Sequence, residues 1–253
     1  MAAQSAEGVI LRKFYLRETS YILVVFTREF GKIRGVLKGA RDPYPQFAGN
    51  FEIFTKCQLL FYRKKKKALD LITQCEALDF FLPVRKDIER LTYANYFIEL
   101  IDIVTSDYDR NEELYDLLVE SLRLLATRSS AKRVGRIFEL KLLKAVGLTP
   151  RLGECVECGA PVSSGFFLSV KDGGVKCRSC LREGSEAFRI SLGTVNFMRK
   201  IIASPVVKTA QIKVSREVGK ETEKLLKRFV QYHIARPVRS LKFLSHLEKA
   251  GIC

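Results

Sequence analysis

The chain has 253 residues, 47% of them hydrophobic, and its 44 basic residues against 28 acidic ones give a formal net charge of +16. This length and apolar fraction suffice for one large domain or for two to three small domains, and they exclude global disorder. The basic excess predicts a polyanionic partner or a membrane surface. No apolar signal-like stretch follows Met1 and no run approaches the roughly 18 apolar residues of a membrane helix, so we expect a soluble cytosolic protein with reduced thiols.

The basic excess is concentrated at the two ends of the chain. Residues 1–80 carry 14 basic and 8 acidic residues, residues 81–150 carry 11 of each, and residues 151–253 carry 19 and 9. Two basic modules therefore flank a neutral one. We expect an α+β multidomain protein with four parts: an OB-fold nucleic-acid-binding domain (1–80), a helical domain (81–150), an inserted four-cysteine zinc-finger module (151–185) and C-terminal helices that pack with the helical domain (186–253).

Short apolar segments separated by turn residues predict five strands, at 9–15, 21–27, 32–38, 51–62 and 69–76. Five short antiparallel strands in about 70 residues suit a small OB-type barrel, although an SH3-like barrel would give a similar pattern. Alternation on the last strand places Leu69, Leu71 and Cys75 on the inward face, and alternation on the strand before it does the same for Cys57. We interpret both cysteines as small core residues.

After Pro83 the spacing of apolar residues becomes helical. We expect helices near 88–105, 114–126, 134–146, 192–203, 218–235 and 240–247. Gly147 and Pro150 end the third of these, Ser191 and Ser215 precede the fourth and fifth, and Pro237 ends the fifth.

Two cysteine couplets form the most specific motif in the chain. Cys155 and Cys158 make the first couplet, Cys177 and Cys180 the second, and 18 residues separate the two. This spacing predicts one tetrahedral zinc site, with a strand and hairpin turn at 166–174 leading to the second couplet; two disulfides are the alternative. A site filled by four sulfurs leaves no position for water, so the zinc ion should be structural.

A run of five cations, Arg63 to Lys67, lies between the fourth and fifth predicted strands, where an OB barrel closes over nucleic acid. A solvated turn that discourages aggregation is the alternative. Other cations and two tyrosines on or beside the strands are expected to converge on the same side, where cations neutralise phosphates and rings stack on bases. The predicted nucleic-acid-binding residues are Arg12, Lys13, Tyr15, Arg17, Arg34, Lys38, Arg41, Tyr62, Arg63, Lys64, Lys65, Lys66 and Lys67.

The order and spacing of several segments resemble the RecO recombination mediators of bacteria, nearly end to end. The first is Gly8 to Leu11 followed by Arg17 to Ser20, then Phe26-Thr27, Gly31 and the stretch 36–41. The second is 138–143 with 147–150, which leads directly into Cys155-x-x-Cys158. Asp42-Pro43 departs from the family pattern, since many relatives carry further basic and small residues there. The family also contains members without the zinc cysteines, whereas this chain has all four.

The resemblance implies a bacterial, cytoplasmic, nucleoid-associated protein without catalytic residues or a small-molecule substrate. Such a protein would bind single- and double-stranded DNA, anneal complementary strands, and help RecA replace single-strand-binding protein in RecF-pathway gap repair. Its implied partners are RecR and the acidic tail of single-strand-binding protein, with RecA acting indirectly. Lys132, Arg133 and Arg136 could form a basic rim for that tail, although a solvated helix face is the alternative.

Three other classes of function are considered. A zinc deaminase would need an H-x-E motif and an open coordination position, but neither His233 nor His246 is followed two residues later by Glu, and no Walker loop or G-x-S-x-G motif occurs. An RNA-binding protein of translation or ribosome assembly would combine the same barrel, zinc and basicity. A module whose basic surface meets acidic proteins is the third alternative.

Overall fold

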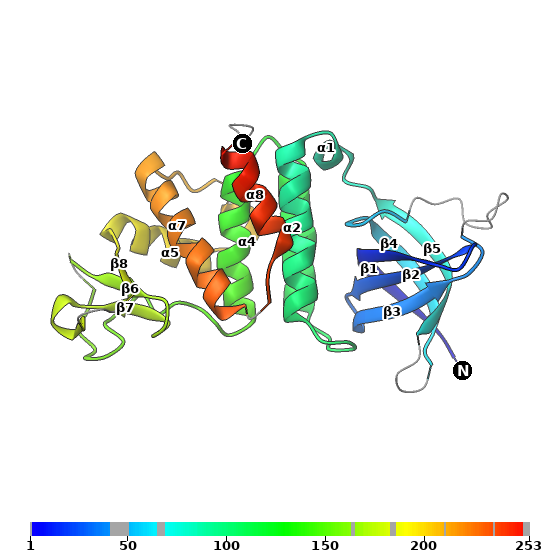
Figure 1. The fold of residues 1–253 in the computed structure, drawn as a ribbon, viewed down its shortest axis with the longest axis horizontal. Helices are drawn as coiled ribbons and strands as arrows, with labels where there is room; N and C mark the ends of the chain where they lie inside the picture. The colour runs from blue at the N-terminus through cyan, green and yellow to red at the C-terminus, as the bar shows by residue number, and fades with distance from the viewer. Residues whose placement is uncertain are drawn as a thin grey trace. The chain divides into compact units, whose positions relative to one another are not determined.

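The structure, a computed structural model, describes residues 2–40, 51–64, 69–162, 165–182, 186–209, 211–234 and 236–249. The chain forms two compact units (Figure 1). Unit 1 comprises Met1–Thr127 with Arg239–Cys253, and unit 2 comprises Arg128–Val238. The four-part division expected from the sequence stays a prediction. No helix in the described ranges is long and apolar enough to cross a membrane.

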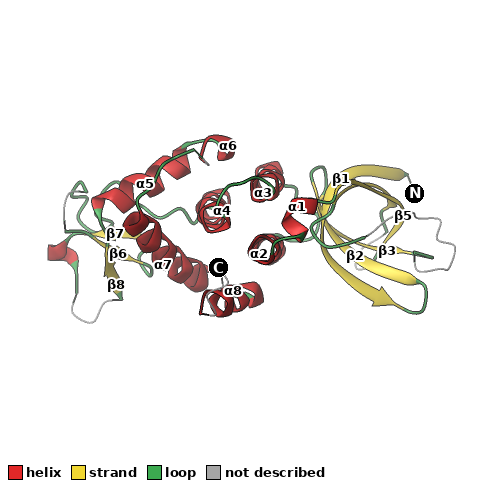
Figure 2. Ribbon diagram, turned by 90° about the horizontal axis from the view of Figure 1, so that it is seen from above, coloured by secondary structure: helices red, strands yellow, loops and turns green. Residues whose placement is uncertain are grey.

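Unit 1 contains a closed five-stranded barrel with the strand order β1-β2-β3-β5-β4 (Figure 2). Neighbouring strands pair antiparallel except β3 and β5, whose parallel pairing, together with the β1–β4 pairing, closes the barrel. This topology confirms the predicted OB-type barrel in an α+β protein. The strands are β1 (Ala3–Leu16), β2 (Ser20–Thr27), β3 (Gly31–Leu37), β4 (Lys56–Tyr62) and β5 (Asp70–Asp79).

The fourth strand begins later than the sequence pattern predicts, at Lys56 rather than near residue 51. Phe54 adopts a left-handed backbone with φ 51°, so the chain turns there instead of extending. Its buried ring lies beneath the guanidinium of Arg85, 4.0 Å from the ring centroid, and its N–H donates to the Ile10 carbonyl at 2.7 Å. Tertiary contacts of an aromatic residue thus replace strand pairing at this point.

The inward face of β5 also differs from the prediction. Ile72 lies in the barrel core, whereas Leu71 is only partly buried. A register shift where β5 pairs with β4, between Leu60 and Phe61, changes the phase of alternation, so that Cys75 packs against the core further along the strand. Cys57 is fully buried, as predicted. A hydrogen bond with the Cys75 thiol, together with burial, raises the pKa of Cys57 well above its usual value.

Within the part of unit 1 that the structure describes, four helices accompany the barrel: α1 (Leu82–Arg85), α2 (Ile88–Val104), α3 (Glu112–Leu125) and α8 (Arg239–Lys249). Side chains of Asp87 and Asn111 accept hydrogen bonds from the first turns of α2 and α3, which explains where these helices begin. Far along the chain, α8 lies beside α2 (Figure 1) because the Glu99 carboxylate accepts the Arg239 and Ser240 N–H groups, each at 2.8 Å. This carboxylate stabilises the start of α8.

A partly buried polar network ties β1, β4 and α3 together. The Glu7 carboxylate lies 2.8 Å from the Lys56 ammonium and accepts a hydrogen bond from the Tyr115 hydroxyl at 3.0 Å. Although burial opposes ionisation of Glu7, its bonds to Lys56 and Tyr115 lower its pKa overall. Burial and the Glu7 charge raise the pKa of Tyr115, which therefore stays a neutral donor.

Unit 2 combines helices with a small three-stranded sheet of order β7-β6-β8. The helices of unit 2 bury a set of large apolar side chains: Phe138, Leu142, Ile201, Leu226 and Phe229. The expected hairpin is present as β6 and β7, and β8 adds a short strand that the sequence pattern did not indicate. The elements are α4 (Ala131–Ala145), β6 (Phe167–Ser169), β7 (Gly174–Lys176), the 3₁₀ turn η1 (Arg178–Cys180), β8 (Ala187–Arg189), α5 (Leu192–Ala203), α6 (Val206–Thr209) and α7 (Arg216–His233).

Candidate nucleic-acid interface and metal centre

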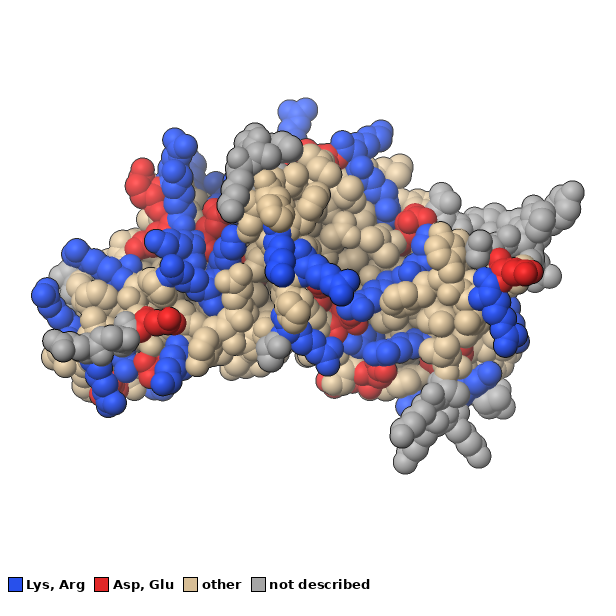
Figure 3. All heavy atoms as spheres, viewed as in Figure 1, with Lys and Arg blue, Asp and Glu red and all other residues tan. Residues whose placement is uncertain are grey.

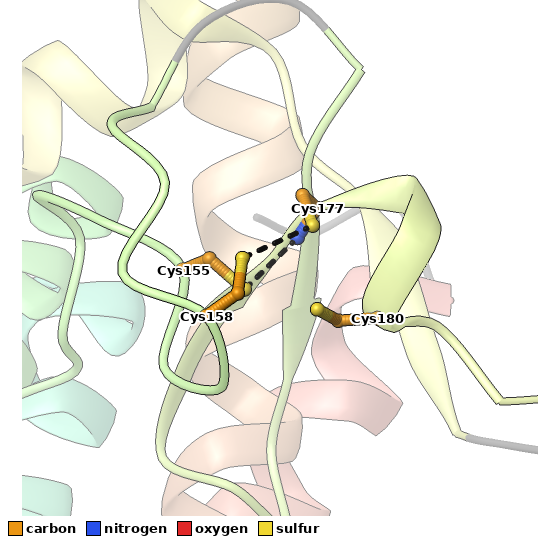
Figure 4. A group of neighbouring side chains, drawn as sticks. All are labelled: Cys155, Cys158, Cys177 and Cys180. Carbon is orange, nitrogen blue, oxygen red and sulfur yellow. Dashed lines mark hydrogen bonds between the residues drawn. The ribbon is translucent and has the colours of Figure 1, made fainter.

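The four couplet cysteines lie together at one end of the small sheet (Figure 4). Backbone hydrogen bonds bring the couplets side by side, because Val156 N–H donates to the Val175 carbonyl and the Arg151 carbonyl accepts from Val175 N–H, both at 2.9 Å. Gly159 has φ +73°, which lets the first couplet turn tightly around its two sulfurs. The second couplet follows β7 directly and closes through η1.

The sulfur geometry fits a tetrahedral metal. All four Sγ atoms lie within 4.8 Å of one another, and those of Cys158 and Cys177 are 3.7 Å apart. Metal–sulfur bonds of about 2.3 Å in a tetrahedron place sulfurs about 3.8 Å apart, whereas a disulfide needs about 2.05 Å. The six cysteines in the described ranges are all free thiols. The arrangement can therefore hold a metal ion, and it does not fit two disulfides.

Backbone amides around the couplets favour ionised sulfur, the form that binds metals. Burial opposes ionisation of Cys155, but N–H donors of Cys158, Cys177 and Glu157 lower its pKa to about 6. Hydrogen bonds with the Cys177 and Cys158 sulfurs, together with burial, raise the pKa of Cys180 to about 12. A bound metal cation would favour the ionised form of the sulfurs that coordinate it.

The barrel carries the predicted nucleic-acid residues, and several of its cations are already paired with carboxylates. Arg12 lies 2.5 Å from Asp102 and Arg34 lies 3.1 Å from Asp107, with about half of each arginine side chain exposed. Lys13 lies 2.6 Å from Glu52. The Arg34–Asp107 pair is exposed on both sides, and such pairs are worth about 0–1 kcal/mol, so a polyanion can displace it at low cost. Asp102 is largely buried, and Lys32 stays bound to it if Arg12 turns to a phosphate.

Three other predicted cations are exposed, and their charged side-chain groups have no carboxylate partner within the described residues. Lys38 follows the end of β3, and Arg63 and Lys64 follow the end of β4. The strand ends thus supply exposed positive charge on the barrel.

One further predicted cation, Arg17, lies in a described turn. Arg17 is exposed at the β1–β2 turn, where it adopts φ 52°. Arg41 and Lys65 to Lys67 lie outside the described residues. Their contact with nucleic acid stays a prediction.

The two tyrosines differ in exposure. Tyr15 is 71% exposed, its ring centroid 5.6 Å from that of Tyr21, and neighbouring Phe14 is 47% exposed. Tyr62, at the end of β4, is only partly buried. Both positions leave ring surface open to solvent, as a stacking role would require, and that role stays a prediction.

Contacts among Arg63, Asp70 and Tyr108 fix the position of the first residues of the cationic run after β4. The sequence pattern did not indicate these contacts. Asp70 is 2% exposed and accepts hydrogen bonds from the Lys64 N–H at 3.0 Å and from the Tyr108 hydroxyl. The Arg63 guanidinium lies 3.9 Å from the centre of the Tyr108 ring. Tyr108 belongs to the α2–α3 loop, so a segment about 40 residues away in sequence fixes where the run begins.

A buried lysine was also missed. Lys32 is 4% exposed, and its ammonium bonds to the Asp102 carbonyl and carboxylate at 2.7 and 3.0 Å. The sequence gives no signal that separates this structural lysine from the exposed cations around it. Asp102 therefore joins β1 and β3 to α2 through Arg12 and Lys32.

The three residues expected to form a rim for a partner tail begin α4. Arg136 is largely buried and lies 2.9 Å from Glu223 of α7, within unit 2. Lys132 and Arg133 are partly exposed. Their assignment to a tail-binding surface stays a prediction.

An OB-type barrel with exposed basic turns, joined to a helical region and a four-cysteine site, defines a class of nucleic-acid-binding protein. Comparison with known families is more specific. The family profile described as Recombination protein O N terminal matches residues 1–81, and Recombination protein O C terminal matches residues 85–242. The chain belongs to the RecO family of DNA repair proteins.

Curated relatives align along almost the whole chain. The DNA repair protein RecO of Symbiobacterium thermophilum is 31% identical over 99% of this chain and 100% of its own length. The RecO of Alkaliphilus metalliredigens is 32% identical over 91% of this chain and 93% of its own, and that of Pelotomaculum thermopropionicum 29% identical over 99% and 96%. The family resemblance expected from the sequence is confirmed.

Proposed function

We propose that this protein is a DNA-binding recombination mediator that anneals complementary strands during recombinational repair, without catalysing a covalent reaction. The observation that carries the proposal is the OB-type barrel whose strand ends present exposed cations, in a chain of the RecO family. Annealing requires charge cancellation between two polyanions while their base edges stay free. Cations on turns, with only a few exposed aromatic rings nearby, meet that requirement because they contact the backbone of the nucleic acid.

The site residues of the proposal lie beyond the ends of β3 and β4 and on strands β1 and β3 of the barrel. Lys38, Arg63 and Lys64 are exposed, their charged side-chain groups have no carboxylate partner in the described part of the chain, and they would contact phosphates first. Lys65 to Lys67, which continue the run, would add to this contact. Arg12, Lys13 and Arg34 would join by exchanging their carboxylate partners for phosphates.

We further propose that the four-cysteine site binds one zinc ion with a structural role. Four sulfurs at tetrahedral spacing support zinc, and they leave no coordination position for a substrate or a reactive water. The ion would fix the two couplets and the β6–β7 hairpin between them. The nucleic-acid function would depend on it only through the fold of unit 2.

The proposed partners follow from the family. They are RecR, the acidic tail of single-strand-binding protein, and RecA indirectly, acting together in gap repair of the RecF pathway. Lys132, Arg133 and Arg136 are the proposed contacts of the tail.

The test is an annealing assay on complementary strands coated with single-strand-binding protein. A variant with Lys64, Lys65, Lys66 and Lys67 replaced by Ser should anneal more slowly. Its binding to single strands should depend less on salt, because each lost phosphate contact removes about 0.7 from the slope of log affinity against log salt.

The matched control replaces four exposed lysines elsewhere, Lys86, Lys208, Lys213 and Lys242, by Ser. This variant has the same net charge as the first and should behave as wild type. Equal salt slopes in both variants would remove the β4–β5 turn from the site. A clear preference of the wild type for RNA over DNA of matching sequence would favour an RNA-binding function instead.

A further inference from the structure

The outer face of α7 carries cations that the proposed barrel site does not use. Lys220, Lys224 and Arg228 follow one another at intervals of four residues, and all three are exposed. Side chains at this interval lie on one face of a helix, about 6 Å apart along its axis. Tyr232 continues the row and is 55% exposed. We call these four residues the α7 stripe.

Two of the three carboxylates of α7, those of Glu221 and Glu223, bind groups on other elements of unit 2, whereas Glu217 is exposed and its charge interacts with Lys220. Glu221 accepts hydrogen bonds from the Ser191 N–H at 3.1 Å and the Ser191 hydroxyl at 2.6 Å, at the start of α5. Glu223 is paired with Arg136 of α4. Glu217 stays in the first turn, where backbone hydrogen bonding and Ser215 lower its pKa. The packing of unit 2 thus uses two of the three acidic side chains of α7 and leaves Lys220, Lys224 and Arg228 exposed.

None of the three stripe cations has an ion-pair partner within the described ranges. The guanidinium of Arg228 instead lies 3.8 Å from the centre of the Phe188 ring of β8. Figure 3 shows Lys and Arg side chains gathered over the region where Figure 1 places α7, with acidic side chains toward its upper end. Three cations on one helix face give a local positive field that attracts a polyanion.

The C-terminal end of the stripe borders a cleft within unit 2 of about 1410 Å³. Arg228, Tyr232, Phe188, Arg151 and Lys171 are among the residues that line it. Two of its three carboxylates, those of Glu157 and Asp172, lie 3.0 and 2.9 Å from the buried Lys176 ammonium, which neutralises part of their charge. The cleft therefore offers aromatic rings beside cations, the combination that binds unpaired bases together with their phosphates.

We propose that the α7 stripe and this cleft form a second single-stranded nucleic-acid site, separate from the barrel. The phosphates of one strand contact Lys220, Lys224 and Arg228, and an unpaired base enters the cleft against Tyr232 and Phe188. This inference rests on the proposed annealing function and deepens it. A chain with two sites holds two strands at once, which raises their effective concentration for pairing.

The experiment counts how many short strands one chain binds. A fluorescent 12-nucleotide oligothymidylate is titrated at low salt into the full-length wild type and into K220E/K224E, and the stoichiometry per chain is determined. We expect two oligonucleotides per wild-type chain and one per K220E/K224E chain. Annealing of uncoated complementary strands should slow at least about 10-fold in the variant, because the second strand is no longer held.

A control variant, K86E/K242E, changes the net charge by the same amount at exposed lysines of unit 1 and should bind two. A second variant, Tyr232→Ser, leaves the charge unchanged and should weaken only the second binding event, by at least about 5-fold, through loss of a stacking ring. Thermal unfolding of each variant verifies that it is folded.

The outcomes separate the two proposals. If K220E/K224E binds as many oligonucleotides as K86E/K242E, the second site is refuted while the barrel function stands. The second site is also refuted if K220E/K224E binds as many oligonucleotides as the control but no longer binds an acidic protein tail. That result would place a protein partner on the α7 stripe. A wild type that binds no oligonucleotide refutes the proposed function itself.

Discussion

Gly31 stands where the barrel leaves no space for a side chain. Its φ is +68°, and a Cβ atom built on it would lie 2.1 Å from the carbonyl oxygen of Asp109. At this point the β2–β3 turn meets the α2–α3 loop, whose Tyr108 N–H donates to the Lys32 carbonyl at 2.8 Å. The same loop carries the Tyr108 hydroxyl that donates to Asp70, and Asp70 also accepts the Lys64 N–H near the start of the cationic run.

Replacement of Gly31 by Ala should destabilise the protein by about 2 kcal/mol or more, because the positive φ adds strain and the methyl group forces the loop away. Gly147→Ala is the matched control: its φ is +76°, but nothing lies within 4 Å of its Cβ position. It should cost only about 1 kcal/mol. Urea unfolding measures both values, and equal losses would show that the contact with Asp109 does not matter.

Single residues also show what the sequence does not reveal about the site. The chain carries cations at Arg12, Lys32 and Arg34 on neighbouring strands, and nothing local distinguishes them. The structure distinguishes them through their ion pairs. Asp102 binds both the buried Lys32 and Arg12, and Asp107 binds Arg34. Those carboxylates are distant in sequence, 70 residues from Lys32 and 73 from Arg34, so pattern and charge could identify the barrel as basic but could not sort its cations.

Among the elements, helices were the most predictable because their ends are marked locally. Ser191 and Ser215 cap α5 and α7 as expected, each accepting a hydrogen bond from an N–H three residues on. Strands were less predictable where tertiary contacts decide. Phe54 turns the chain before β4, the irregular pairing of β4 and β5 changes the inward face of β5, and β8 is three residues long. The cysteine couplets were recognisable because their spacing itself specifies the geometry.

If the four-cysteine site holds the proposed zinc ion, removing that ion should unfold part of unit 2. Structural zinc contributes roughly 10 kcal/mol or more to the folding of small modules, more than the short β6–β7–β8 sheet can replace. After treatment of the full-length protein with a chelator, hydrogen exchange should show loss of amide protection in residues 151–190. Protection in residues 3–37 of the barrel should persist.

The number of zinc ions bound per chain tests the same site independently. Cys158→Ser should reduce bound zinc well below one ion per chain, whereas Cys75→Ser, a thiol outside the couplets, should leave it at one. Unchanged amide protection after zinc has left would contradict a structural role for the ion.

At the scale of the whole molecule, charge and fold point to the same class of partner. The chain carries a net charge of +16, and cations remain exposed at the barrel turns and along α7, whereas Glu221 and Glu223 of α7 are bound to Ser191 and Arg136. Phosphate contacts of this kind are independent of sequence, and they leave base edges free to pair. Strand annealing then needs no catalytic group, only two strands held without their pairing edges being covered.

We propose that the protein binds single-stranded DNA mainly through contacts with its phosphates. The salt dependence of binding is the most direct test of this proposal. Fluorescence anisotropy of a labelled single-stranded oligonucleotide, short enough to occupy one site, is followed from about 50 to 200 mM salt. If about six phosphates are neutralised, log affinity should fall against log salt with a slope near −4, about 250-fold over this range. An absence of association even at the lowest ionic strength, or an affinity that does not change with salt, would contradict the account.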